Sequence, residues 1–499
     1  MDDRTLILTI VGCYLVSCLG IGLWASRRTK SAADFFIAGK SIGVWILGFA
    51  SFSTVASGFA FIGGPGLVYS LGTSSLWICV PAGLGFAVTV VLVGKRLRVF
   101  AEFFDILTLP DAIAIRYDSR LCRFLSAIVI LLGVIGYLGV QILALGTVAE
   151  TFFGIERSTA AVIGVSVIVF YAVTGGILAS LYTDVVQGTL MLVASVALFV
   201  VALTTAGEGS FSEGPANITR AFLASETPDA IGAFGLAGPM LCLSWLFIFS
   251  VGSAGQPHVI TKYFMVRRVA DIRAATLVSA VAYSLCILLW VSVGFAMKYL
   301  VLTGREPPLE NADHAAPTFL LHHAPAWLAG IVFAGLFSAI MSTADAFLNI
   351  GAAVFVRDLP KALRGRPIRR EVLGARLATV LIAAAATAFA LGMGDLVAVL
   401  GIFSWGTFAA AIFPVVAIGF NWKRATRQAA AAAMVTGLAG HLALELLRRY
   451  PSEAPAYRLP YSVDTGAVAL LLSIVVFVAV SFLTPARAPE RRLDAAIEI

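Results

Sequence analysis

Three residues within one apolar stretch have the types and spacing of a small-cation site. Ala339, Ser342 and Thr343 stand at positions i, i+3 and i+4, so a helix directs one backbone carbonyl and two hydroxyls toward the same point. A hard monovalent cation such as sodium takes oxygen ligands of this kind. The alternative is that both hydroxyls bond back to carbonyls of their own helix. Taken alone, the pattern leaves both interpretations open.

The elements that must position these residues are membrane helices. Of the 499 residues, 60% are hydrophobic and 13% are charged, which is more apolar surface than a water-soluble core can bury. Apolar runs of about 20 residues, long enough to cross the bilayer as a helix, recur along the chain. The alternation that a membrane barrel needs is absent from the sequence. We therefore predict an all-α polytopic membrane protein and no enzyme.

Hydropathy predicts thirteen transmembrane spans. They lie near residues 5–26, 43–70, 74–95, 122–150, 159–181, 184–205, 232–256, 273–302, 326–356, 372–392, 395–420, 428–450 and 463–484.

Basic residues predict how these spans are oriented. The net charge is +7, and alternate connections hold roughly 27 of the 35 Lys and Arg, beginning with Arg27 and including the stretch 262–273. This asymmetry places those connections in the cytoplasm, the N-terminus outside and the C-terminus inside. The same asymmetry explains the positive net charge, so binding to nucleic acid is not needed to explain it. We expect a multi-pass protein of the plasma (inner) membrane.

Two of the spans contain breaks. The span 43–70 carries Gly58 and the run 63–66 of glycine and proline, and the span 232–256 ends in Gly252 to Pro257. Paired broken helices at corresponding positions of two repeats mark midplane binding sites in transporters, although glycines also serve close packing. The expected organisation is an N-terminal helix with its loop, a first five-helix repeat, an external loop, a second inverted repeat, two further helices and a tail, at 1–42, 43–205, 206–231, 232–420, 421–484 and 485–499.

Two acids are difficult to explain as loop residues. Asp345 lies within the ninth span, and Asp184 opens the sixth. Carboxylates inside a membrane usually face a cavity or a partner, so both are candidates for coupling or gating. Asp184 is equally well explained as a helix-capping acid. Asp345 is explained either as tuning the cation site or as the partner of Asn349.

Polar and aromatic residues near the breaks are candidates for binding a solute. Tyr137 and Gln141 share one helical face, and the cation site is expected to draw carbonyls from the break near residues 53–57. The histidines lack metal spacing, so we assign them no metal. The candidates for solute binding are Ser57, Gly58, Tyr137, Gln141, Phe249, Ser253 and Pro257.

The chain resembles the sodium/solute symporter family, and within it the bacterial proline-transporting members. The resemblance covers nearly the whole chain. It is carried by residues 34–41, Ser57-Gly58 with 63–66, the stretch 107–111, the stretch from Gly175-Gly176 to Gln187, Gly255-Gln256-Pro257-His258, and 339–343.

This resemblance implies a sodium site and a mechanism. The implied ligands are the carbonyls of Ser53, Ala56 and Ala339 and the hydroxyls of Ser342 and Thr343. It also implies inward symport of one solute with sodium by alternating access. Sodium is then the coupling ion, and we expect no cofactor and no obligate protein partner.

The sequence departs from the proline-transporting members where their solute pocket lies. Val55 replaces an aspartate in the first broken helix, and Phe249 and Ser253 replace Trp and Tyr before Gln-Pro-His. The expected solute is therefore an amino acid such as proline or a monocarboxylate. Proton coupling through Asp184 or Asp345 is the first alternative. A transporter-like sensor acting through a separate partner is the second.

Overall fold

The described residues form an all-helical molecule. The computed structural model describes residues 3–26, 42–393, 396–449 and 462–485. Among them, the one β contact is an isolated bridge between Ile42 and Val266. The predicted all-α class is confirmed. The predicted stretch 34–41, the basic residues from 27 to 40 and the tail 486–499 lie outside the described residues.

The α-helices have the following bounds. They are α1 Asp3–Ser26, α3 Val44–Val55, α4 Gly64–Leu71, α5 Leu76–Thr89, α6 Lys95–Phe103, α7 Leu109–Tyr117, α8 Arg120–Phe153, α9 Arg157–Ala206, α10 Gly214–Leu223, α11 Pro239–Ser250, α12 Pro257–Ile260, α13 Asp271–Leu302, α14 Ala315–His323, α15 Ala326–Ala353, α16 Leu359–Arg364, α17 Glu371–Met393, α18 Val397–Phe413, α19 Arg427–Arg449 and α20 Thr465–Leu483. Short 3-10 or π segments join several of them: η2 Phe59–Gly63, η3 Gly72–Ser75, η4 Val90–Gly94, η5 Pro228–Ile231, η6 Gly252–Gly255, η7 Thr261–Phe264, η8 Ala312–His314, η9 Val354–Asp358 and η10 Pro414–Ile418.

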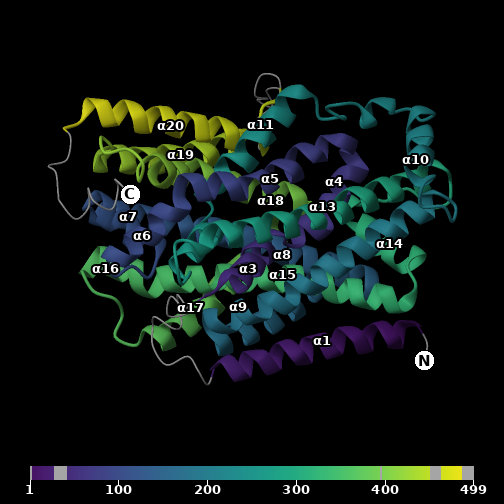
Figure 1. The fold of residues 1–499 in the computed structure, drawn as a ribbon, viewed down its shortest axis with the longest axis horizontal. Coiled ribbons are helices and arrows are strands. Elements are labelled where there is room, and N and C mark those ends of the chain that lie inside the picture. The colour runs from purple at the N-terminus through teal and green to yellow at the C-terminus, as the bar shows by residue number, and fades with distance from the viewer. Residues whose placement is uncertain (1–2, 27–41, 394–395, 450–461, 486–499) are drawn as a thin grey trace.

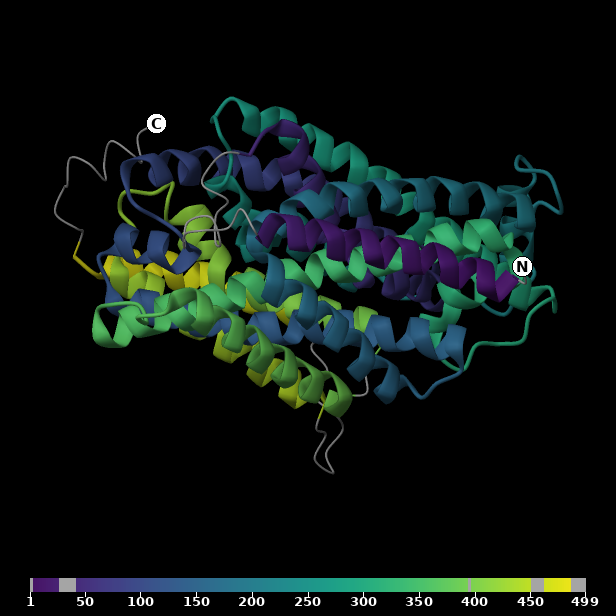
Figure 2. The same ribbon diagram turned by 90° about the horizontal axis from the view of Figure 1, so that it is seen from below.

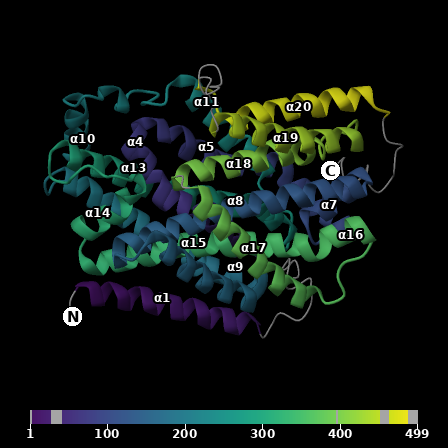
Figure 3. The same cartoon turned by 180° about the vertical axis from the view of Figure 1, so that it is seen from behind.

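Most of the long helices follow the long axis of the molecule (Figure 1). One end holds α10, α14 and the start of α1, and we call it the α10 end. The opposite end holds α6, α7 and α16, and we call it the α16 end (Figure 3). Helix α1 lies along the outside of the bundle (Figure 2), where it packs on α9 and α15. Helices α19 and α20 pack on α18.

Ten helices in the described part of the chain are long and apolar enough to cross a membrane. Three shorter apolar helical segments, Val44–Val55, Arg157–Phe170 and Pro239–Ser250, correspond to the second, fifth and seventh predicted spans. The structure thus confirms a polytopic protein, whereas thirteen crossings remain a prediction.

Helix α9 corrects the predicted boundary between the fifth and sixth spans. It is continuous for 50 residues, with no loop between residues 181 and 184. A straight helix of that length would be about 75 Å long. Yet Arg157 at its start lies 3.7 Å from Asp313, and Glu208 just past its end contacts Arg305. Residues 305 and 313 are at most about 28 Å apart along the chain, so α9 must bend back within its length.

Both predicted breaks are present. Helix α3 ends at Val55, and the chain resumes as η2 at Phe59 before α4. Helix α11 ends at Ser250, and η6 and Gln256 separate it from α12. Helix α15 is buried along almost its entire length and packs against α9, α8 and α3. The first broken helix therefore meets the central helix that carries the candidate hydroxyls.

Close packing beside the first break predicts the effect of one substitution. A Cβ on Gly64 would lie 2.3 Å from Cδ2 of Trp290, whose Nε1 donates to Ser75 Oγ at 2.7 Å. Because this indole is also packed edge-to-face on Phe59, it cannot move aside easily. Gly64→Ala should lower stability by about 1–3 kcal/mol, measured as the melting temperature in detergent. Gly12→Ala, which has nothing within 4 Å, is the control. Equal melting of the two variants would contradict this packing.

Candidate functional site

The first break brings backbone groups into the protein interior. Ala56 follows the last residue of α3 and has a ψ angle of 75°, so the backbone leaves the helical path at this residue. The N–H of Gly58 donates to Oε1 of Gln141 at 3.0 Å. A Cβ on Gly58 would lie 2.7 Å from the Cβ of Ala144, so glycine permits the close approach of α8. Gly58 and Gln141, predicted separately, therefore meet.

The predicted cation ligands converge on this break. Ser342 Oγ donates to the carbonyl of Ser53 at 2.9 Å, and Thr343 Oγ1 donates to the carbonyl of Thr54 at 3.0 Å. Both hydroxyls also lie near the carbonyl of Ala339, at 3.4 Å and 3.0 Å respectively. All of these residues are buried. The two hydroxyls thus bond both to their own helix and to the end of α3, and a cation held among these oxygens remains a prediction.

Thr54, whose carbonyl accepts the bond from Thr343, lies within the stretch 53–57 that was expected to supply carbonyls but was not named as a ligand. Every residue has a backbone carbonyl, so the residue type does not show which carbonyl is a ligand. The position next to the break is what identifies it. Ala56, the remaining implied ligand, is also fully buried at this break. The arrangement offers several neutral oxygens in a dry site, which is the chemistry that sodium requires.

Aromatic rings pack beside the break. Phe249 stacks on Phe59 at 6.0 Å and on Trp405 at 5.1 Å between ring centroids. Tyr137 stacks on Phe347 at 4.6 Å, and His258 lies 5.7 Å from Tyr137 and 5.9 Å from Trp405. These six residues form the aromatic cluster. Phe249 and Tyr137 were predicted, whereas Trp405 and Phe347 were missed because aromatic residues in spans usually only pack.

The other predicted solute residues occupy different surroundings. Ser57 Oγ accepts from the N–H of Phe59 at 3.2 Å. Ser253 Oγ donates to the carbonyl of Phe249 at 2.5 Å and faces α5, where a Cβ on Gly85 would lie 2.1 Å away. Pro257 begins α12. Ser253 thus packs against α5, and its part in binding a solute remains a prediction.

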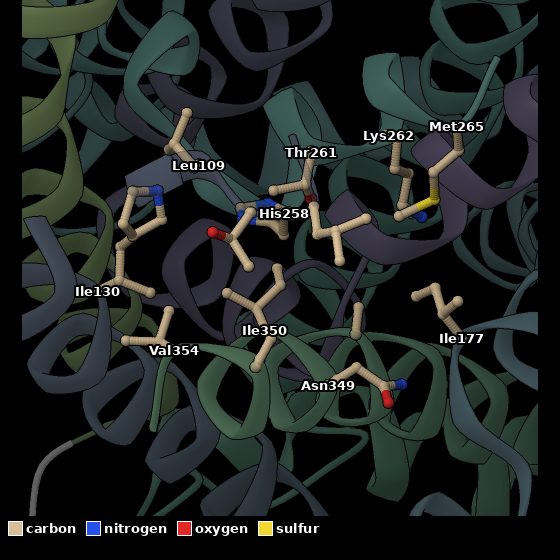
Figure 4. A pocket seen from close by; sticks show the side chains of 15 residues that line it. Leu109, Ile130, Ile177, His258, Thr261, Lys262, Met265, Asn349, Ile350 and Val354 are labelled. Atoms are coloured by element: carbon tan, nitrogen blue, oxygen red, sulfur yellow. The ribbon is translucent and has the colours of Figure 1, made fainter. Parts of the chain in front are cut away.

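A small cavity of about 30 Å³ lies beside His258 of the aromatic cluster (Figure 4). His258, Lys262 and Asn349 line it together with apolar side chains from residues 107–110 and from α15. This volume accommodates a water molecule and is too small for an organic solute.

The acid Asp184 lies in the interior of α9, which corrects the interpretation of it as a capping residue at a helix start. It is fully buried, and its Oδ2 lies 3.5 Å from Nζ of Lys262. Lys262 was assigned to a basic connection, but its side chain is 3% exposed. Lys262 lies in η7, shortly after the second break, and its side chain points into the protein. From sequence alone it was grouped with the basic stretch 262–273, so its buried position was not predicted.

Asp345 follows the cation face on α15. Nδ2 of Asn349 donates to its Oδ1 at 3.0 Å, which is the pairing considered from sequence. Asp345 also lies within electrostatic range of Asp184 and Lys262. Within the described residues, its Oδ2 and both carboxylate oxygens of Asp184 accept no hydrogen bond. The break therefore borders a buried group of two carboxylates and one ammonium.

A second charged cluster joins the helices at the α16 end. Asp111 accepts from Arg123, from Lys361 at 3.0 Å and from Arg357 at 3.3 Å. Burial by itself would raise the pKa of this carboxyl, but the charges of Arg123, Lys361 and Arg357 outweigh it and hold the pKa below its usual value. The cluster links α7 to α8, η9 and α16.

We predict that Asp111→Asn destabilises the protein by about 3–5 kcal/mol, because Lys361 then loses its acidic partner while Arg123 and Arg357 keep only Asp358 and Glu371. The melting temperature in detergent, measured against pH, is the readout. Since the folded pKa is lowered, the contribution of Asp111 is full above the unfolded pKa of about 4 and is lost as pH falls through the folded pKa. Glu213→Gln, in an exposed pair with Arg220, should cost about 1 kcal/mol or less. Equal melting of the two variants would remove this role from Asp111.

This geometry defines the class of protein. Two broken helices meeting a central helix in an all-α membrane bundle form the broken-helix transporter fold. A sodium-coupled sialic acid symporter, solved in a substrate-bound outward-open state, aligns with a TM-score of 0.79 at 18% identity, covering 97% of this chain and 99% of that one. A nucleobase-cation-symport-1 family transporter in a closed conformation aligns with a TM-score of 0.52 at 16% identity, covering 94% and 99%.

The chain belongs to the sodium:solute symporter family, whose model matches residues 35–437. It is 30% identical over 435 residues to the sodium/proline symporters of Salmonella typhimurium (strain LT2) and Escherichia coli (strain K12), covering 85% of this chain and 84% of each of those proteins. The osmoregulated proline transporter of Bacillus subtilis (strain 168) is 26% identical over 450 residues, covering 87% of both chains. The family resemblance read from the sequence motifs is thereby confirmed.

Proposed function

We propose that this protein is a secondary active transporter that imports a small organic solute with sodium by alternating access. The observation that carries the proposal is the contact of Ser342 and Thr343 with the carbonyls of Ser53 and Thr54. Without an ion, the hydroxyl hydrogens point at those carbonyls. When sodium binds, the hydroxyls rotate, and hydroxyl and carbonyl oxygens point at the ion together. Sodium thus strengthens the contact between α3 and α15.

The solute is proposed to bind between the two breaks, beside the aromatic cluster. Ser57, Gly58, Tyr137 and Gln141 supply polar groups on one side, and Phe249, Ser253 and Pro257 supply the other. An amino acid such as proline and a monocarboxylate share a carboxylate, which backbone N–H groups at a break can hold. Because sodium and solute would share the first break, each ligand favours the conformation that binds the other.

The proposed orientation places the α16 end in the cytoplasm. Basic residues gather there on α6, α7, α16 and the starts of α8 and α17, in agreement with the positive-inside rule. The N-terminus is then outside and the C-terminus inside. The two inverted repeats are proposed as residues 43–205 and 232–420, which move against each other during transport.

Proton coupling is the second candidate, because one observation favours it. Asp184 and Asp345 are buried close to the break and hold carboxylate oxygens without hydrogen-bond partners among the described residues. A proton on either acid would remove its buried negative charge without sodium. Under this proposal, an inward pH gradient in sodium-free buffer drives uptake, and sodium has no effect.

Uptake into proteoliposomes separates the two candidates. A thermal-shift screen of proline, other amino acids and short carboxylates, in NaCl or choline chloride, first selects a solute. Radiolabelled uptake of that solute is then measured under an inward sodium gradient or an inward proton gradient. We expect accumulation with sodium only. Uptake that ignores sodium would overturn sodium symport.

We predict that Thr343→Ala raises the sodium concentration for half-maximal uptake about tenfold or more, because one ligand oxygen is lost. The solute concentration for half-maximal uptake, measured at saturating sodium, should change less than about threefold. Thr379→Ala is the matched control, since Thr379 is a buried threonine on α17 that bonds to the carbonyl of Ala375. Unchanged sodium dependence in Thr343→Ala would remove Thr343 from the site.

A further inference from the structure

Lys262 connects the second broken helix to the first. It lies in η7, directly after α12, with its side chain 3% exposed. Its ammonium donates to the carbonyl of Ala50 and to Oγ1 of Thr54 on α3. Thr54 is also the residue whose carbonyl accepts from Thr343. The ammonium therefore sits on the same turn of α3 that presents the carbonyl of Ser53 to the candidate sodium site.

Two buried acids accompany Lys262. Asp184 lies 3.5 Å from the ammonium, and Asp345 lies within its electrostatic range. Asp184 and Asp345 are both buried, so two acidic side chains and one lysine share this interior position. Both carboxylate oxygens of Asp184 and Oδ2 of Asp345 have no hydrogen-bond partner among the described residues.

We infer that Lys262 is a tethered cation that competes with sodium at the first break. This inference rests on the proposed sodium symport and adds the residue that sets its sodium affinity. In the sodium-free protein, the ammonium takes the oxygens of Ala50 and Thr54 and neutralises one carboxylate. When sodium binds, the sodium ion and the Lys262 ammonium both lie at the same buried turn of α3. Their repulsion shifts the ammonium toward Asp184 and Asp345.

A lysine suits this role because its charge sits at the end of a flexible stem with rotatable donors. The same side chain also ties α12 to α3, so its shift loosens one contact between the two broken helices at the moment sodium binds. Sodium binding would then both strengthen the contact of α3 with α15 and weaken its contact with η7. The alternative role is a fixed structural tie that does not respond to the ion.

The test uses the purified full-length protein in detergent, with sodium itself as the probe. The melting temperature is measured from zero to high NaCl, with choline chloride holding ionic strength constant and no solute present. We predict that Lys262→Met lowers the half-saturating sodium concentration about tenfold, because the competing charge is gone. Lys262→Arg, which keeps the charge, should stay within about threefold of the unaltered protein.

Lys298→Met is the matched control, since it makes the same chemical change at a lysine that packs on the ring of Tyr69. It should leave the half-saturating sodium concentration unchanged. Lys262→Gln, which can still donate to Thr54, is expected to behave as Lys262→Met and provides a second neutral variant if the first does not fold.

The outcomes separate this inference from the proposed function. An unaltered protein that sodium stabilises, with a Lys262→Met variant of equal or weaker sodium affinity, overturns the competition alone. If neither neutral variant folds, Lys262 is a fixed tie and the competition is likewise overturned. If sodium does not stabilise the unaltered protein, sodium symport fails and this inference fails with it.

Discussion

Helix α3 ends at Val55, inside the protein, and the backbone groups freed there need hydrogen-bond partners. The rest of the structure depends on supplying those partners. In a bilayer, backbone groups released by a break have no water to bond and must find partners within the protein. Ser342 and Thr343 supply hydroxyls to the carbonyls of Ser53 and Thr54. Helix α15 must therefore lie against the break, and α8, α9 and α1 enclose it. The central position of α15 follows from this requirement.

The same condition concentrates the costly charges of the membrane interior in one place. Asp184, Lys262 and Asp345 come from α9, η7 and α15, far apart along the chain, yet they are gathered beside the first break. Charges at this depth persist where they face a partner or carry function. Here the three charged residues lie near the last turn of α3, whose carbonyls belong to the candidate cation site. The same few residues are therefore subject both to these charges and to the backbone break.

The ion site and the solute site differ in how they depend on side chains. The candidate ion ligands are mainly backbone carbonyls and small hydroxyls, which many sequences can present once the break is formed. The solute candidates include the large side chains of Tyr137, Gln141 and Phe249, whose shape depends on the residue type. The 30% identity to the sodium/proline symporters and the match of the family model over residues 35–437 show the family membership.

The sequence by itself determined the membrane class, both breaks and the shared face of Ser342 and Thr343, because hydropathy, glycine and proline content and helical periodicity are local properties. The tertiary structure decided that Thr54 supplies a carbonyl, that Lys262 turns inward, that Trp405 and Phe347 join Phe249 and Tyr137, and that α9 continues through residues 181 to 184. Periodicity fixes which residues share a face of one helix. Which other helix meets that face depends on contacts between residues hundreds of positions apart, and no local pattern records them.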